Sequence, residues 1–256
     1  MHLHYRSYGS GHPLIILHGL LGSLDNWATL AKRLAAQFHV FAFDARNHGR
    51  SSHSDVMNYD VMVEDLRAFM REHGIASAHL LGHSMGGKTA MQFAVEHPEY
   101  VNRLIVVDIA PKAYGRRHDH IFEALCSLDL KKFSHRKEAE EVLSQKIHEP
   151  ATVQFLLKNL VREEEGTFKW KMNLPVLKKH YDEISAGLSE GAKFEKPALF
   201  VRGGKSSYIL DEDRALIKKI FPRSNILTVK NAGHWVHADA PDELEKIVVG
   251  FLSAKP

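Results

Sequence analysis

The chain has 256 residues, enough for one large α/β domain, either alone or with a modest insertion. Apolar residues make up 44% and charged residues 25% of the sequence, as in ordinary soluble globular proteins. The net charge of +3 comes from 34 basic and 31 acidic residues without a dense Lys/Arg stripe, and this balance argues against a nucleic-acid-binding protein.

The same survey yields expectations about location and partners. The first six residues lack the basic and apolar segments of a signal peptide, and no run approaches the roughly 18 apolar residues of a membrane span. The single cysteine, Cys126, has no internal disulfide partner and no metal-type spacing around it, so we expect it to be buried or half-buried. We expect a cytoplasmic protein that acts on a small molecule without a metal or cofactor, and leave monomer or homodimer open.

Strand and helix patterns alternate through the first half of the chain. Short apolar runs predict buried strands, and apolar residues spaced by three or four predict amphipathic helices. In chain order, these patterns predict a strand at 14–17, a helix over 27–38 capped by Asp25, a strand at 40–43, a helix over 62–70 ended by Gly74, a strand at 79–82, a helix over 84–97 and a strand at 104–107. Such alternation predicts right-handed βαβ units and a mostly parallel sheet covered on both faces.

The pattern changes after Pro111. Residues 113–190 are highly charged and helical in pattern, with no convincing strand among them. Strand patterns return at 197–201 and 226–229, and apolar residues on one face of a final helix follow over 244–251. We therefore predict a sheet domain formed by 1–112 and 191–256, interrupted by a helical cap over 113–190.

Residues 82–86, Gly-His-Ser-Met-Gly, match the G-x-S-x-G nucleophile elbow. The serine of this motif occupies a strained strand-to-helix turn, where glycines two residues away avoid a collision. A strand pattern precedes the motif and a helix pattern follows it, so a chance pentapeptide in a glycine-rich turn is the weaker interpretation. We predict that Ser84 is a nucleophile at a helix N-terminus, whose dipole favours developing negative charge.

A serine nucleophile that attacks an acyl group needs donors for the resulting oxyanion. His18-Gly19-Leu20 follows the strand at 14–17, where this architecture places a second donor. We predict that the backbone N–H groups of Leu20 and Met85 form the oxyanion hole. His18 lies on the oxyanion side, and we expect it to support the loop rather than transfer a proton.

The general base is predicted from chain order. A serine hydroxyl needs an imidazole to accept its proton, and a histidine pKa near 6.5 suits this role. His234 follows the final strand, in the order nucleophile, acid, base. His237 is the nearest rival among 18 histidines, and we expect it to have a minor structural or binding role.

The acid of the triad is the most ambiguous member. The loop after the penultimate strand, residues 201–208, contains neither Asp nor Glu. Asp108 follows the strand at 104–107, on the same sheet edge as Ser84, from where a carboxylate could bind the imidazole Nδ1–H. We therefore predict Asp108, with Asp211 as the fallback, although Asp211 resembles a helix cap and Asp108 could instead cap a loop.

Two other polar features are expected to be structural. Residues 44–51 form a polar turn that fastens the loop after the strand at 40–43. Lys88 lies just inside the elbow helix, and nothing in the sequence marks it for the burial that would lower its pKa.

With these residues placed, the chain resembles the YbfF-like bacterial esterases, relatives of the α/β-hydrolase-domain proteins of mitochondria. The matching stretches are 18–27 (HGLLGSLDNW), 44–51 (DARNHGRS), 82–88 (GHSMGGK), 107–111 (VDIAP), 117–122 (RHDHIF) and 233–238 (GHWVHA). The resemblance implies the α/β-hydrolase fold, a helical cap, Asp108 as the acid, and esterase activity on short- to medium-chain acyl esters. It leaves acyl thioesters open, and residues 131–190 match only loosely.

The leading hypothesis is therefore a cofactor-free carboxylesterase or thioesterase that works through Ser84, His234 and Asp108. The same triad could instead serve perhydrolysis or C–C bond hydrolysis, which depend on pocket contents that sequence does not reveal. A third hypothesis is a non-catalytic ligand receptor on the hydrolase scaffold. An intact serine, histidine and oxyanion frame argues against a receptor, which needs none of the three.

Overall fold

Seven short strands form the central sheet of the computed structural model, which describes residues 1–254. In chain order they are β1 (Tyr5–Tyr8), β2 (Pro13–Leu17), β3 (His39–Phe43), β4 (Ala78–His83), β5 (Val101–Val107), β8 (Ala198–Gly203) and β9 (Ser224–Val229). Most of their residues are buried, which matches the continuous apolar runs from which six of these strands were predicted.

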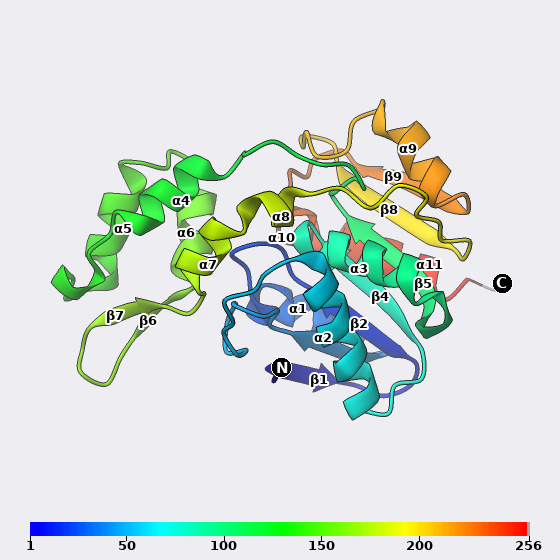
Figure 1. Cartoon of the computed structure of the whole chain (residues 1–256), viewed down its shortest axis with the longest axis horizontal. Coiled ribbons are helices and arrows are strands. Elements are labelled where there is room, and N and C mark those ends of the chain that lie inside the picture. The colour runs from blue at the N-terminus through cyan, green and yellow to red at the C-terminus, as the bar shows by residue number, and fades with distance from the viewer. Residues whose placement is uncertain (255–256) are drawn as a thin grey trace.

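The strands lie in the order β1-β3-β2-β4-β5-β8-β9 (Figure 1). All neighbouring pairs are parallel except β1 and β3, and β1 was not predicted from the sequence. The mostly parallel sheet predicted from the sequence, in the architecture of the α/β-hydrolase fold, is confirmed. In register, His83 pairs with Val107 and Val107 with Val201, so β4, β5 and β8 end at the same edge.

Helices cover both faces of this sheet. The helical elements of this part are η1 (Leu24–Trp27), α1 (Ala28–Leu34), α2 (Tyr59–Glu72), α3 (Met85–Glu96), η2 (Pro98–Tyr100), α9 (Asp213–Ile220), α10 (Val236–Asp239) and α11 (Pro241–Leu252). Apolar residues of α2, α3 and α9 pack in one buried cluster, and those of α1, α10 and α11 pack in another on the opposite face. Asp25 does not cap α1 as predicted, because it lies within η1, where its carboxylate pairs with Arg6 at 2.7 Å.

Residues 113–190, called the cap segment below, leave the sheet after β5 and return before β8. They form α4 (Asp119–Cys126), η3 (Leu130–Lys132), α5 (Arg136–Ser144), α6 (Pro150–Leu157), β6 (Leu160–Arg162), β7 (Phe168–Trp170), α7 (Leu174–Lys179) and α8 (Tyr181–Ser185). The expectation of a segment without strands was wrong, because β6 and β7 pair antiparallel. Strands of three residues are too short to show the alternation by which a strand is predicted.

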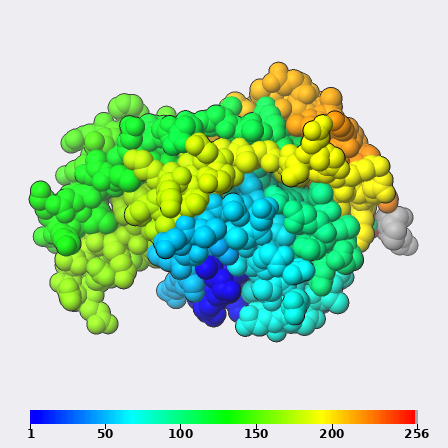
Figure 2. All heavy atoms as spheres, viewed as in Figure 1, coloured from blue at the N-terminus to red at the C-terminus, as the bar shows by residue number. Residues whose placement is uncertain are grey.

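The cap segment lies beside one end of the sheet part, and its return stretch after α8 runs along α3 (Figures 1 and 2). Its apolar residues share one buried cluster with Leu21, Met57 and Met85, which belong to loops and the elbow of the sheet part. Cys126, the last residue of α4, is exposed, so the expectation of a buried thiol was wrong. None of the helices within residues 1–254 is long and apolar enough to cross a membrane.

Candidate active site

Four non-glycine residues with positive φ lie just after the carboxyl ends of four adjacent strands. They are Leu21 after β2, Asn47 after β3, Ser84 after β4 and Asp108 after β5, with φ between 50° and 62°. This region of φ/ψ space costs about 1–3 kcal/mol per residue for non-glycine side chains, and such strain clusters at functional sites. The backbone is therefore bent away from regular geometry along one edge of the sheet, where Ser84 and Asp108 lie.

The sharp turn at Ser84 depends on its neighbouring glycines. A Cβ atom on Gly82 would lie 2.3 Å from the Gly86 carbonyl oxygen, and one on Gly86 would lie 2.4 Å from that of Leu17. Both approaches are shorter than any tolerable contact, so each position requires glycine. The turn leaves Ser84 at the start of α3, with a side chain that lines a cavity.

Asp108 and His234 are joined by a hydrogen bond of 2.8 Å between Nδ1 of the imidazole and Oδ2 of the carboxylate. A carboxylate only accepts, so Nδ1 carries the proton and Nε2 presents its lone pair. Asp108 is 0% exposed, whereas the His234 side chain retains 20% exposure toward the cavity. The ring of Tyr208 stacks on His234, with 3.9 Å between ring centres and an 18° angle between planes.

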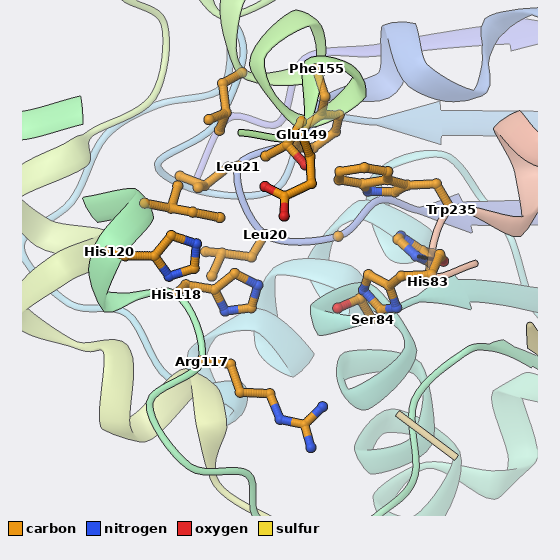
Figure 3. Close-up of a pocket in the computed structure, with 15 residues that line it drawn as sticks. Leu20, Leu21, His83, Ser84, Arg117, His118, His120, Glu149, Phe155 and Trp235 are labelled. Carbon is orange, nitrogen blue, oxygen red and sulfur yellow. Dashed lines mark hydrogen bonds between the residues drawn. The ribbon is translucent and has the colours of Figure 1, made fainter. Parts of the chain in front are cut away.

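Ser84 and His234 line the same cavity of about 240 Å³, which lies between the strand ends and the cap segment (Figure 3). Within residues 1–254, no hydrogen bond joins the Ser84 hydroxyl to the imidazole. Catalytic hydrogen bonds are often long before substrate binds and shorten in the reacting complex.

The backbone places two free N–H donors beside Ser84. A Cβ on Gly19 would lie 3.2 Å from that of Ser84, so the loop after β2 passes directly against the elbow. The N–H groups of Leu20 and Met85 donate to no acceptor among the described residues. They are therefore available to an oxyanion formed at Ser84.

The loop after β8, which lacks an acid, binds the Asp108 carboxylate instead. The Gly203 N–H donates to Asp108 Oδ1 at 2.9 Å, and the Ser206 hydroxyl donates to Oδ2. Together with His234, these groups give the buried carboxylate three hydrogen-bond donors, which hold it in place. Ser206 was not predicted as a site residue, because a lone serine in a loop has no distinguishing pattern.

Asp211, the alternative acid, lies elsewhere. Its carboxylate binds Arg202 and Arg214, which lower the pKa of Asp211, and its side chain is 77% exposed. The neighbouring Asp213 accepts from the Leu210 N–H near the start of α9.

The walls of the 240 Å³ cavity differ in chemistry (Figure 3). Arg117, His118 and His120 line one side from the start of the cap segment, and Glu149 points into the cavity from the N-terminus of α6. Trp235, next to His234, contacts Phe155 of α6 with 5.1 Å between ring centres. The cavity is thus built partly from the strand ends and partly from the cap segment.

A second, smaller cavity of about 30 Å³ also reaches Ser84. Its walls include Lys88 and Ile184, but not His234. Its polar lining also includes Arg117, His118, Ser185 and four tyrosines: Tyr59, Tyr114, Tyr181 and Tyr208. Ser84 therefore lies where two cavities of different size meet.

Burial keeps the neighbouring histidines neutral. It lowers the pKa of His18 and His83, and lowers that of His48 and His237 to about 3. His18 Nδ1 bonds the Gly19 carbonyl and its Nε2 accepts from the Ala45 N–H, so this ring supports the loop. His237 stacks on Trp27 with 4.3 Å between ring centres.

Residues 44–51 fasten the loop after β3. Asp44 accepts from the N–H groups of Leu24 and Arg50, and Arg46 forms a buried two-bond pair with Asp65 at 2.6 and 2.9 Å. In the described part of the chain, no group of three or more His, Cys, Asp or Glu side chains could hold a metal ion.

Lys88 departs from the sequence-based expectation. Its side chain is among the largest fully buried ones, and this burial lowers its pKa to about 7. The stretch that covers it comes from the end of the cap segment, about 97 residues away in the chain. A local sequence pattern cannot show that contact.

Comparison with known proteins places this geometry in a family. The family model described as alpha/beta hydrolase fold matches residues 12–241. The chain is 40% identical to the mouse sn-1-specific diacylglycerol lipase ABHD11 over 94% of this chain and 80% of that protein, and 36% identical to Esterase YbfF of Escherichia coli K12 over 94% and 93%. A solved marine microorganism esterase superposes with a TM-score of 0.95 at 44% identity, covering 97% of this chain and 98% of that one.

These relatives are named esterases or a lipase, and they support a hydrolase activity for the chain. The chain belongs to the α/β-hydrolase family.

Proposed function

We propose that the protein hydrolyses carboxylic esters with short- to medium-chain acyl groups through an acyl-enzyme on Ser84. The observation that carries this proposal is the buried Asp108 carboxylate bound to His234 Nδ1 at 2.8 Å, beside a serine on a strained turn. That bond sets the tautomer in which Nε2 can accept the serine proton.

The proposed reaction has two halves. Ser84 Oγ attacks the acyl carbon while His234 Nε2 takes its proton, and the Leu20 and Met85 N–H groups stabilise the oxyanion. The imidazolium, paired with Asp108, then protonates the leaving oxygen, which departs as the alcohol. Water attacks the acyl-enzyme with His234 as base, and the carboxylic acid leaves Ser84 free.

The two cavities at Ser84 suggest how the ester lies. The leaving oxygen must receive its proton from His234, which lines only the 240 Å³ cavity of the two. We therefore assign the alcohol to that cavity and the acyl chain to the 30 Å³ cavity. A volume of this size has room for roughly two or three heavy atoms, which places the preference at the short end of the acyl range.

The proposal is tested by p-nitrophenyl butyrate hydrolysis with wild type and Ser84→Ala. We expect kcat of the variant to be at least about 10⁴-fold lower than that of wild type. Activity near wild type in folded Ser84→Ala would refute the nucleophile assignment.

An acyl-length series on p-nitrophenyl esters and acyl-CoA thioesters then separates an esterase from a thioesterase. Perhydrolysis by the same triad is checked by adding hydrogen peroxide and measuring peracid. Folded wild type that hydrolyses no ester and no thioester would instead favour the receptor hypothesis.

A further inference from the structure

Lys88 carries a buried amine that the proposed reaction does not use. It lies one helical turn after Ser84, and its backbone N–H donates to the backbone carbonyl of Ser84 at 3.0 Å. Its side chain is 1% exposed. No Asp or Glu of residues 1–254 forms an ion pair with it.

The partners of Lys88 Nζ are three backbone carbonyls. It donates to Lys112 at 2.6 Å, to Ser185 at 3.3 Å, and to Ala186. An ammonium has three N–H donors and no acceptor, so this site matches its hydrogen-bonding capacity. The Tyr114 ring centre also lies 4.9 Å from Nζ.

These carbonyls belong to the two stretches that connect the cap segment to the sheet part. The chain enters the cap segment at 110–114 and leaves it at 184–188, and we call these two stretches the cap hinge. Two backbone hydrogen bonds join these stretches. The Tyr114 N–H donates to the Ser185 carbonyl at 2.9 Å, and the Leu188 N–H donates to the Pro111 carbonyl at 3.0 Å.

The two stretches cross at very close range. A Cβ on Gly187 would lie 2.8 Å from the Ala113 nitrogen and 3.0 Å from the Lys112 carbonyl carbon. Figure 1 shows the yellow-green return stretch after α8 running beside α3, the helix that carries Lys88. The hinge therefore has little room to adjust while the crossing stays closed.

We propose that Lys88 is a positioning residue that holds the cap hinge closed against the nucleophile helix, and thereby keeps the small cavity beside Ser84 narrow. The hinge residues Tyr114, Ile184 and Ser185 line that cavity together with Lys88 itself. The link to acyl-chain selection rests on the proposed function, whereas the link to hinge closure does not.

Other charged and titratable groups near Lys88 do not replace it. Lys112 Nζ pairs with Asp213 at 2.7 Å and lies 5.5 Å from the centre of the Tyr114 ring. Burial raises the pKa of Tyr114 and of Tyr59, so both stay neutral phenols. Removing the amine would leave three buried carbonyls without this donor, which costs free energy. If the cap hinge opened, water could donate to these carbonyls and remove that cost.

The test of hinge closure is hydrogen exchange in Lys88→Met, which keeps the length of the side chain but removes its donors. We expect peptides that cover 110–116 and 183–190 to exchange at least roughly tenfold faster than in wild type. Lys196→Met is the matched control, because Lys196 Nζ also donates to two carbonyls, of Pro98 and Val101, outside the cap hinge. Unchanged exchange of the hinge peptides in folded Lys88→Met would overturn the proposal.

The test of acyl selection is kinetic. We expect the ratio of kcat/KM for p-nitrophenyl acetate to that for p-nitrophenyl hexanoate to fall by roughly tenfold in Lys88→Met and to stay unchanged in Lys196→Met. A purely structural loss would lower both esters equally, and an equal loss would contradict the positioning role. If wild type hydrolyses neither ester, the proposed function fails, while the exchange experiment still decides the hinge.

Gly187→Ala keeps the proposal testable if Lys88→Met does not fold. Its new methyl group would push the crossing stretches apart while Lys88 remains in place. We expect faster exchange in the same two peptides and a lower acetate-to-hexanoate ratio. Wild-type values for both measurements would show that the crossing of the two stretches does not determine the width of the small cavity.

Discussion

The sheet part of the molecule, residues 1–112 and 191–254, and the cap segment are stabilised by different contacts. The sheet part has its own apolar clusters on both faces of the sheet, and strands that are largely buried. The α-helices of the cap segment have five to nine residues, and its apolar cluster continues onto loops of the sheet part. Helices this short are marginal on their own and depend on tertiary packing.

This difference separates the groups that we propose to react from the groups that shape the cavity. Ser84, Asp108 and His234 all come from the sheet part, where buried strand ends hold them. The cap segment contributes Glu149, Phe155 and other walls of the larger cavity. Substitutions at strand ends should therefore change turnover for every ester, whereas those in the cap segment should change which ester is preferred.

The largest loss of turnover is expected for a change at Asp108, the proposed acid of the triad. Asp108→Asn should lower turnover by about 10⁴, because an amide can stabilise the wrong tautomer of His234. Asp211→Asn should leave turnover within about twofold, because Asp211 is an exposed partner of Arg202 and Arg214. The measurement is kcat on p-nitrophenyl butyrate, and the opposite pattern would transfer the acid role to Asp211.

A smaller loss is expected for Ser206→Ala. This change removes one of three donors to the Asp108 carboxylate, and a hydrogen bond to a charged group contributes about 1.5–3 kcal/mol. We expect turnover to fall by roughly 10- to 100-fold, with KM little changed. Ser207→Ala is the control, because Ser207 Oγ accepts from Arg117 rather than bonding Asp108. Equal effects of the two changes would argue against a role through Asp108.

The cap segment is probed by Ile184→Ala, which enlarges the small cavity. The preferred acyl chain should lengthen, with a roughly tenfold gain for hexanoate relative to acetate, since each added methylene contributes about 0.8 kcal/mol. The readout is kcat/KM across p-nitrophenyl esters from acetate to octanoate. A uniform loss across the series would mean that the acyl chain does not occupy this cavity.

The smallest effect concerns stability in acid. Burial lowers the pKa of His237 to about 3 in the folded protein. Between about pH 6.5 and pH 3, this histidine therefore binds a proton more readily in the unfolded chain than in the folded protein. Stability should therefore fall as pH drops through this window, by up to about 1.4 kcal/mol per pH unit for this group. His237→Phe should flatten the slope of the free energy of unfolding, measured by urea denaturation at pH 4 to 7. A slope equal to that of wild type would show that His237 is not held neutral.

The sheet was readily predicted because its strands are continuous apolar runs and its helices are amphipathic. The elbow was predictable for a steric reason, since the glycines at 82 and 86 are required by the backbone around Ser84. β1 is different, because its residues are only partly buried at the sheet edge and give a weak pattern.

The remaining features depend on contacts between distant segments. Lys88 is covered by a stretch about 97 residues later, and Ser206 lies 98 residues from the carboxylate that it binds. β6 and β7 have three residues each, too few for an alternating pattern to be visible in the sequence. Such contacts arise from the fold rather than from local patterns.

The most direct measurement is the reaction of folded protein with a fluorophosphonate, followed by mass spectrometry of the labelled peptides. We predict one adduct, on Ser84, that is absent from Ser84→Ala and forms at least about 10³ times more slowly in His234→Gln. An adduct on another residue, or no adduct on folded wild type, would contradict a serine nucleophile activated by His234.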